Sequence, residues 1–387
     1  MDTFRIKIKQ DKLLVKDVAF FNEIKSSQFS NSPNHKHEKT NNAFRNELAD
    51  KGIYTPKFHL SDVDFGIPDN ALVLEFSAPK LLYGTNLKEV SEKDFTAVVD
   101  KLKIFLKAIG IGAFETHIRN APATLTAYAR NIPVGQFGKA AEILRVVAPF
   151  DYRPRSQFNN VIFRQGVITS ELKYFNKHSH LVLYDKLTEI LNNPMTDQEK
   201  RIADYLKYGT NKTELEAWVK QTLRVELTLH KKSAVKQAMA KYYGQKNDYT
   251  FEEVFKDQIR DDLLKTEIDN IFNHPLKEII LLSIYERDTF NAVIDQYAKT
   301  FSQRAEIRFM LDVLYSRGLN ALREEIVARA SERTWFRKQK QLKVVSEQIQ
   351  LPQGITQLDN AAVLEYLLAE FGITSKLKAP KQLTLLG

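Results

Sequence analysis

The chain has 387 residues, and its 57 lysines and arginines against 48 aspartates and glutamates give a formal net charge of +9. This excess of positive charge favours an acidic partner. Hydrophobic residues make up 43% of the sequence, with 14 glycines and 12 prolines, so a buried core is expected and the collagen-like and disordered classes are excluded. The absence of cysteine excludes disulfides, cysteine-ligated zinc, iron–sulfur clusters and a thiol nucleophile.

The first ten residues alternate apolar and charged side chains, which is typical of a strand and not of a signal peptide. No stretch approaches the ~18 consecutive apolar residues of a membrane-spanning helix. We therefore expect a cytoplasmic protein that has no membrane partner. Residues 26–42 are rich in serine and asparagine and nearly devoid of apolar side chains, which predicts an exposed loop.

The segment 71–76, ALVLEF, alternates as a strand and places Glu75 on its wetter face. A helix follows, because Ser91 and Asp94 have the spacing of a capping box and apolar residues then recur at helical spacing up to Gly110. Further short β-rich segments occur at residues 159–163, 180–185 and 223–229, with a polar, helical insert near 196–220.

The segment 223–229 has the clearest strand pattern. Its leucines and valine fall on one face, while Arg224, Glu226 and His230 fall on the other. A carboxylate is therefore expected on a sheet, between an arginine and a histidine.

Beyond residue 248 the apolar spacing becomes helical, starting from a second capping box at Thr250 and Glu253. The predicted fold class is α+β, with a mixed N-terminal part followed by an all-helical domain and then a C-terminal helix and tail. The predicted boundaries of these three parts are 1–246, 247–350 and 351–387.

Positive charge is concentrated in two blocks. Residues 223–246 carry six basic residues against one acid, and residues 300–343 carry ten against five. Such concentration is the expected footprint of a protein that binds a phosphate backbone. The alternative is that these lysines and arginines only solvate helix faces.

The usual signatures of ATPases, zinc proteases and serine hydrolases are missing from the sequence. Carboxylates on neighbouring strands, such as Glu75 and Glu226, can jointly hold Mg²⁺ or Mn²⁺, which prefer oxygen ligands and would polarise a phosphate. Tyr184 ends an apolar strand two residues before Lys186, and a tyrosine that attacks phosphorus needs help to lose its proton. The alternatives are that Tyr184 is a core or rim aromatic and that Glu226 is a salt-bridge partner.

At these residues the chain resembles the rolling-circle replication initiators of the filamentous-phage gene II type and their plasmid relatives. Four blocks are similar to the family in order along the chain: LVLEFSAPKLLYGTNL from residue 72, HSHLVLYDKLTEI from residue 178, LRVELTLHKKSAVK from residue 223, and the arginine-rich stretch 301–338. Together these blocks extend from about residue 70 to residue 345.

The resemblance implies an antiparallel-sheet nuclease core with flanking helices, followed by a basic helical domain that binds DNA. It implies a metal-dependent endonuclease that nicks and rejoins one DNA strand, with Tyr184 as the nucleophile that forms a 5′-phosphotyrosine and Lys186 as its catalytic neighbour. The 3′-hydroxyl that is released would be extended by a polymerase. The expected partners are origin DNA, duplex and single-stranded, together with a host helicase and polymerase.

The resemblance also implies metal ligands at Glu75 and Glu226, with Mg²⁺ or Mn²⁺ as the cofactor. An acid that the family carries after its long helix is missing here near Ala127, and Glu115 and His117 are the nearest substitutes. His178 or His180 could serve instead. The residues expected to bind DNA are Lys80, Arg224, Lys231, Lys232, Arg304, Arg308, Arg333, Arg337 and Lys338.

Two other classes of function remain open from sequence alone. The first is a non-enzymatic DNA-binding protein, such as an origin-melting initiator or a repressor that reads DNA with helices between residues 300 and 345. The second is a basic RNA-binding module, which the sequence does not support because it lacks an aromatic RNP-like strand.

Overall fold

The structure is a computed structural model that describes residues 1–15, 54–64, 67–147, 171–175, 178–192, 196–208, 218–219, 221–272, 294, 297–348 and 360–374. The predicted loop 26–42 and the predicted strand 159–163 lie outside these residues. The chain divides into two compact units. Unit 1 comprises Met1–Asn131, Phe175–Val182 and Lys186–Leu264, and unit 2 comprises Ile132–Tyr174, Leu183–Asp185 and Lys265–Gly387.

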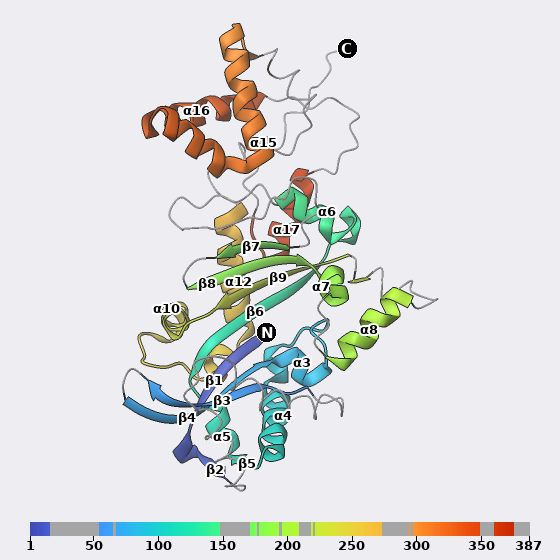
Figure 1. Cartoon of the computed structure of the whole chain (residues 1–387), viewed down its shortest axis with the longest axis vertical. Coiled ribbons are helices and arrows are strands. Elements are labelled where there is room, and N and C mark those ends of the chain that lie inside the picture. Colours follow the sequence, from blue (N-terminus) through green and yellow to red (C-terminus); the bar gives the residue numbers. More distant parts are fainter. Residues whose placement is uncertain are drawn as a thin grey trace, which may run out of the picture. The chain divides into compact units, whose positions relative to one another are not determined.

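The fold is α+β, as predicted, and is built on a seven-stranded antiparallel sheet (Figure 1). In spatial order the strands are β3 (Lys57–Asp64), β4 (Ile67–Ser77), β1 (Thr3–Lys9), β6 (Ala123–Pro133), β9 (Thr222–Leu229), β8 (Ser179–Asp185) and β7 (Glu171–Phe175). The N-terminal strand β1 lies inside the sheet and pairs antiparallel with both β4 and β6. A two-stranded sheet joins β2 (Leu13–Val15) to β5 (Ile111–Ala113).

An aromatic cluster holds the sheet of unit 1 on its helices. Phe4 of β1 stacks on Phe255 with 5.2 Å between ring centroids, and meets Phe251 edge-on at the same separation. Phe95, at the start of α4, lies 5.0 Å from each of the same two rings. All of these side chains are buried, so the alternating apolar residues of β1 form the predicted strand because one face of that strand has an aromatic core to pack against.

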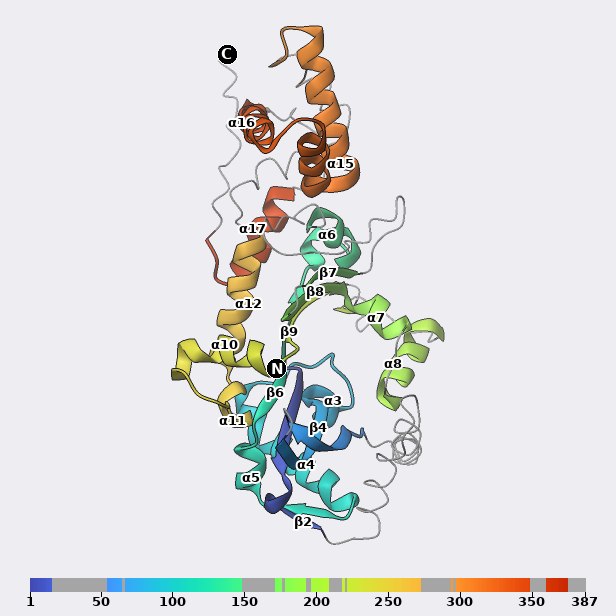
Figure 2. The same ribbon diagram turned by 60° about the vertical axis from the view of Figure 1, so that its left-hand side comes forward.

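The capping signals read from the sequence are confirmed. Ser91 and Asp94 form the capping box that leads into α4 (Phe95–Ala108), and Gly110 follows the helix with a φ of 74°. Thr250 and Glu253 form the second box, at α11 (Phe251–Val254). The other helices of this part are α3 (Ala78–Tyr83), which lies beside α4 (Figure 2), α5 (Glu115–Arg119), α7 (Lys186–Asn192), α8 (Asp197–Tyr208), α10 (Lys232–Tyr243) and α12 (Asp257–Phe272). Three short 3₁₀ turns are η1 (Gln10–Lys12), η2 (Glu92–Asp94) and η3 (Gly135–Phe137).

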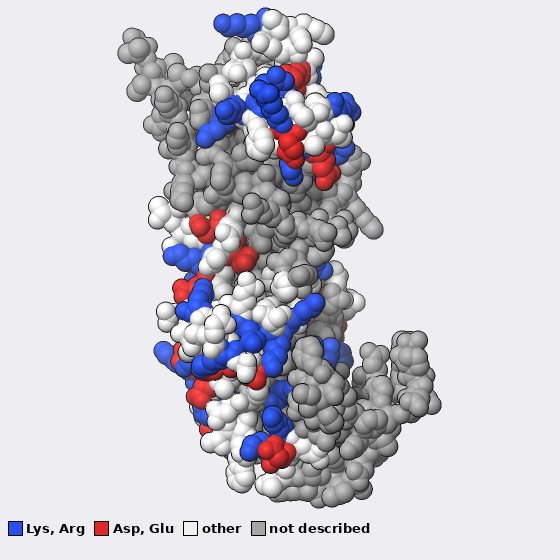
Figure 3. Space-filling view, turned by 90° about the vertical axis from the view of Figure 1, so that its left-hand side faces the viewer, with Lys and Arg blue, Asp and Glu red and all other residues white. Residues whose placement is uncertain are grey.

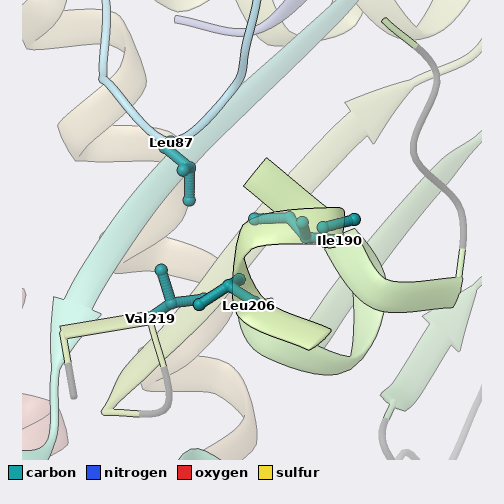
Figure 4. Close-up of a cluster of buried hydrophobic side chains, with 5 residues drawn as sticks. Leu87, Ile190, Leu206 and Val219 are labelled. Atoms are coloured by element: carbon teal, nitrogen blue, oxygen red, sulfur yellow. The ribbon is translucent and has the colours of Figure 1, made fainter. Parts of the chain in front are cut away.

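The predicted helical insert is present as α8, and two sets of contacts fix it to the rest of unit 1. An apolar cluster joins Leu87, Ile190, Leu206 and Val219 (Figure 4). Beside this cluster, the Nζ of Lys80 on α3 donates to Oε2 of Glu199 on α8 over 3.0 Å, and both side chains are buried.

The described part of unit 2 is helical apart from β7 and the strand ends it contributes to the sheet. Its helices are α6 (Ala140–Val147), α15 (Phe301–Arg329), α16 (Glu332–Gln348) and α17 (Asn360–Glu370). All regular elements described beyond residue 250 are helices, in agreement with the sequence pattern. Within the described residues, no helix has the length and apolar character needed to cross a membrane.

Burial of the Lys80–Glu199 pair generates a stability prediction. Lys80→Met leaves the Glu199 carboxylate buried without its cation, so we expect a loss of about 3–5 kcal/mol in the free energy of unfolding. The double variant Lys80→Met/Glu199→Met removes both charges and should recover most of that loss. Urea denaturation measures both values. The control is Lys200→Met, which changes an exposed lysine on α8, the helix that carries Glu199. A Lys80→Met variant as stable as this control would contradict the structural role of the pair.

Candidate functional site

Strand β9 carries the polar face that the sequence predicts. Leu223, Val225, Leu227 and Leu229 are all buried, which is the apolar face of the alternation. On the other face Glu226 is partly buried, but Arg224 is only 1% exposed. The polar face of β9 is therefore not simply a solvated surface, because the arginine on it is enclosed.

Arg224 is enclosed by a set of hydrogen-bond acceptors from four parts of unit 1. Its Nη2 lies 3.0 Å from Oδ2 of Asp2 at the start of β1, and its Nη1 donates to Oδ1 of Asn131 over 2.9 Å and to the carbonyl of Asn86 over 3.1 Å. Its Nε lies 3.8 Å from Oε2 of Glu226. A guanidinium offers donors in a fixed planar fork, so this arrangement fixes the relative positions of the four segments.

The carboxyls of Asp2 and Glu226 share a hydrogen bond. Burial raises the pKa of Glu226, and the negative charge of Asp2 raises it further against the opposing effect of Arg224. Burial alone would also raise the pKa of Asp2, but Arg224 and the hydrogen bond from Glu226 outweigh burial and lower it. At neutral pH Glu226 therefore holds the shared proton and Asp2 is ionised.

Asp2, just before β1, lies beside Ala127 in the backbone pairing. The backbone N–H of Asp2 donates to the carbonyl of Ala127 over 3.0 Å. Which residue replaces the acid missing near Ala127 stays open. The sequence-predicted substitutes are elsewhere: Glu115 pairs with Arg119 over 2.7 Å, and Nδ1 of His117 lies 3.0 Å from the carbonyl oxygen of Lys12.

Lys186 is fully buried beside the same cluster. Its Nζ donates to Oδ1 of Asn86 and, over 2.8 Å, to Oε2 of Glu189. Burial, reinforced by the positive charge of Arg224, lowers the pKa of Lys186 to about 8. Asn86 thus contacts both Arg224 and Lys186, and it links the end of β8 to β9.

Two histidines form a second group of titratable side chains. The rings of His180 on β8 and His230 after β9 lie 3.7 Å apart between centroids. Burial lowers the pKa of His230, and the nearby His180 and Arg5 lower it further. The Nε2 of His230 is buried and has no hydrogen-bond partner among the described residues.

The predicted cluster of carboxylate metal ligands does not appear in the described part of the chain. Glu75 accepts from Nε of Arg5, its cross-strand neighbour, over 2.8 Å, and lies 3.9 Å from Nζ of Lys57. No described group of three His, Asp or Glu side chains lies close enough together to hold a metal ion. The metal assignment of Glu75, Glu226, Glu115 and His117 therefore stays a prediction.

Tyr184 lies on the more accessible face of β8. Burial alternates along this strand, with Leu181, Leu183 and Asp185 buried while His180 and Tyr184 are partly exposed. The phenol is therefore not part of the apolar interior. By the alternation of side chains it shares a face of the strand with His180.

The basic residues that the sequence assigned to DNA divide into three groups. Lys80 and Arg224 are buried and paired with carboxylates, so direct contact with a phosphate would require their exposure. Lys232 pairs with Asp248, and Lys338 with Glu306. Lysines and arginines do gather on the face drawn in Figure 3. The exposed members of the predicted set are Lys231, Arg304, Arg308, Arg333 and Arg337.

The proton held by Glu226 generates a prediction on pH dependence. The folded state keeps this proton at pH values where the unfolded chain, with an ordinary glutamate pKa of ~4.3, has released it. Stability from this group is therefore greatest at low pH and is lost as pH rises through the raised pKa. Glu226→Gln mimics the protonated form. The free energy of unfolding of this variant, relative to that of the wild type, should therefore increase as pH rises from ~5 to ~8.

Urea denaturation across this pH range measures the difference. The control is Glu365→Gln, which removes the same charge from an exposed position of α17. Parallel profiles for Glu226→Gln and the wild type would contradict the shared proton.

Comparison with known proteins adds one finding to this geometry. Residues 163–247 match the family model for the N-terminal region of the phage gene II replication-associated protein. Neither the curated proteins nor the solved structures give a match. The matched stretch includes β8, β9 and the segments that join them, and so contains Tyr184, Lys186 and Glu226. Over this stretch the chain matches the filamentous-phage gene II family of replication initiators, as its sequence motifs predict.

Proposed function

We propose that the protein initiates rolling-circle replication by nicking one strand at the origin of its replicon. The observation that carries the proposal is the family match over residues 163–247. That stretch brings together the strand with Tyr184 and the strand with Glu226, which the sheet order places side by side as β8 and β9. Origin DNA is the proposed substrate, and a host helicase and polymerase are the proposed partners.

In the proposed reaction the Tyr184 oxygen attacks the phosphorus of one phosphodiester. A bond forms between the tyrosine oxygen and phosphorus, the bond from phosphorus to the 3′ oxygen breaks, and the phenol proton is balanced by protonation of that 3′ oxygen. The products are a 5′-phosphotyrosine and a free 3′-hydroxyl. Because one phosphodiester replaces another, the reverse reaction rejoins the strand without a nucleotide cofactor.

The buried polar cluster supports the proposal through position. Asn86 contacts both Arg224 of β9 and Lys186, the residue that follows β8. We propose that this cluster positions β8 and β9 and does not itself touch the DNA.

The family resemblance also implies a divalent cation, which polarises the phosphate when it is bound. Among the described residues the donor set that best fits such an ion is the imidazole pair of His180 and His230. Their rings are in contact, and Nε2 of His230 is a buried nitrogen without a hydrogen bond. The lowered pKa of His230 keeps that ring neutral at pH 7, which is the form that binds metals. Glu75 and Glu226 are engaged by Arg5 and by Asp2.

Removal of the tyrosine oxygen tests the nucleophile. Tyr184→Phe keeps the shape of the ring but cannot form a phosphotyrosine. We expect it to bind the replicon DNA with unchanged affinity and to form no covalent adduct. Incubation with supercoiled replicon DNA, followed by denaturing gel electrophoresis, measures nicked circles and attached protein. An undiminished adduct would exclude Tyr184, and the control Tyr205→Phe, at an exposed tyrosine of α8, should nick normally.

Removal of one imidazole tests the cation site. His230→Gln should weaken Mn²⁺ binding by about 10-fold or more, since one of two nitrogen ligands is lost. Electron paramagnetic resonance of free Mn²⁺ measures this binding without requiring activity. Glu365→Gln, at an exposed position of α17, is the control. Equal Mn²⁺ affinity in His230→Gln and wild type would contradict the assignment.

The second candidate function is a DNA-binding protein that leaves DNA intact, and the exposed arginines of α15 and α16 favour it. Such a protein would bind the origin without nicking it. The supercoiled-DNA experiment distinguishes the two functions, because only the endonuclease converts supercoiled circles to nicked circles with protein on the 5′ end.

A further inference from the structure

The end of unit 2 contains a compact helix–turn–helix arrangement. Helix α15 changes direction at Gly318, whose φ of 81° and ψ of 178° are not helical, so that a shorter helix follows up to Arg329. A turn of two residues then leads into α16. Ser331 in that turn accepts from the backbone N–H of Thr334 over 3.2 Å, which caps α16 in the manner of an N-cap serine.

One face of α16 is fixed against α15. Trp335, Leu342 and Val345 are almost completely buried, and the two helices pack together (Figure 1). Ion pairs hold the same orientation, since Arg323 of α15 contacts Glu332 over 2.5 Å and Lys338 contacts Glu306. The inward face of α16 is therefore occupied, and only its outer face is available to a partner.

The outer face of α16 is basic and carries an exposed aromatic ring. Arg333, Phe336, Arg337 and Lys340 are all exposed, and their spacing of three or four residues places them in one stripe of the helix. The ring of Phe336 is 59% exposed. Within the part of the chain that the structure describes, the three cations of this stripe make no ion pair.

We propose that this stripe of α16 lies in the major groove of duplex DNA and reads the origin sequence. The choice of DNA as the partner rests on the proposed function. The surface on α16 is separate from the nicking residues on β8 and β9, and its role is to recognise the origin sequence. With 17 residues, α16 is ~25 Å long, and an α-helix fits a major groove ~12 Å wide. Arginine and lysine match the phosphates and the acceptor edge of guanine, and an exposed phenylalanine can meet the methyl group of thymine.

The position of the stripe supports groove reading over simple attraction to phosphate. In helix–turn–helix proteins the second helix enters the groove, with its N-terminal residues at the base edges. The stripe begins at Arg333, the second residue of α16, and Phe336 and Arg337 follow one turn later. An acidic protein partner would also attract these cations, but the core of a protein–protein interface is depleted of charged residues, whereas three of the four residues in this stripe are charged.

The test measures binding of the full-length protein to a labelled pool of random 30-base-pair DNA duplexes, by fluorescence anisotropy at several salt concentrations. Arg333→Ala and Arg337→Ala should each weaken binding by about 5- to 100-fold and lower the salt slope by about one. Phe336→Ala should leave the salt slope unchanged and alter the sequences that the protein selects from the pool. All three substituted positions are exposed, so thermal unfolding should show wild-type stability.

The matched control is Arg201→Ala, which removes an exposed arginine from α8 in unit 1. Variants of the stripe that bind like this control would overturn the proposal. Equal affinity for a 30-base-pair RNA duplex would also overturn it, because the deep, narrow major groove of A-form RNA does not admit a helix.

The proposal and the nicking function fail in different ways. On single-stranded circular replicon DNA, which needs no duplex reading, the stripe variants should form the covalent adduct as the wild type does, whereas Tyr184→Phe should not. Loss of the adduct in the stripe variants would show that α16 serves the nicking reaction and not duplex recognition. If the wild-type protein binds duplex DNA normally but forms no adduct, the proposed nicking function is wrong and the proposal for α16 stands.

Discussion

The structure of unit 1 depends on the burial of one guanidinium. Arg224 reaches Asp2 just before β1, Asn131 on β6 and Asn86 in the segment after α3, while its own strand also carries Glu226. A buried cation is stable only if its donors are satisfied, so these segments must close on Arg224 together. The same closure forces Asp2 and Glu226 together and makes them share a proton. Lys186 is buried beside the same residues, and burial, reinforced by the positive charge of Arg224, lowers its pKa.

The sequence predicted those parts of the fold that local pattern determines. Alternation identified the strands with Glu75, Tyr184 and Glu226, and the capping pairs identified the starts of α4 and α11. Strand β6 was not among the predicted strands. The predicted boundary at 246 lies within unit 1, which continues to Leu264.

Contacts between residues far apart in the sequence could not be predicted from local sequence patterns. Lys80 and Arg224 were predicted to bind DNA because they are basic. Both are buried, because each forms an ion pair with a carboxylate, Lys80 with Glu199 and Arg224 with Asp2. The position of Asp2 beside Ala127 could not be predicted, since only strand pairing joins residues so far apart in the sequence. His230 was read as one polar residue of β9, whereas its contact with His180 depends on the neighbouring strand. By contrast, two of the four family-like blocks lie within the matched stretch 163–247, and these blocks carry Tyr184 and Glu226.

The proposed nicking function depends on a covalent bond between DNA and the phenol on the accessible face of β8. The most direct measurement is mass spectrometry of the wild-type adduct with replicon DNA, after digestion by protease and nuclease. We expect a nucleotide attached through phosphate to the peptide that contains Tyr184, and to no other peptide. A nucleotide on the peptide of Tyr174 or Tyr205, or nicked DNA with no attached peptide, would contradict it.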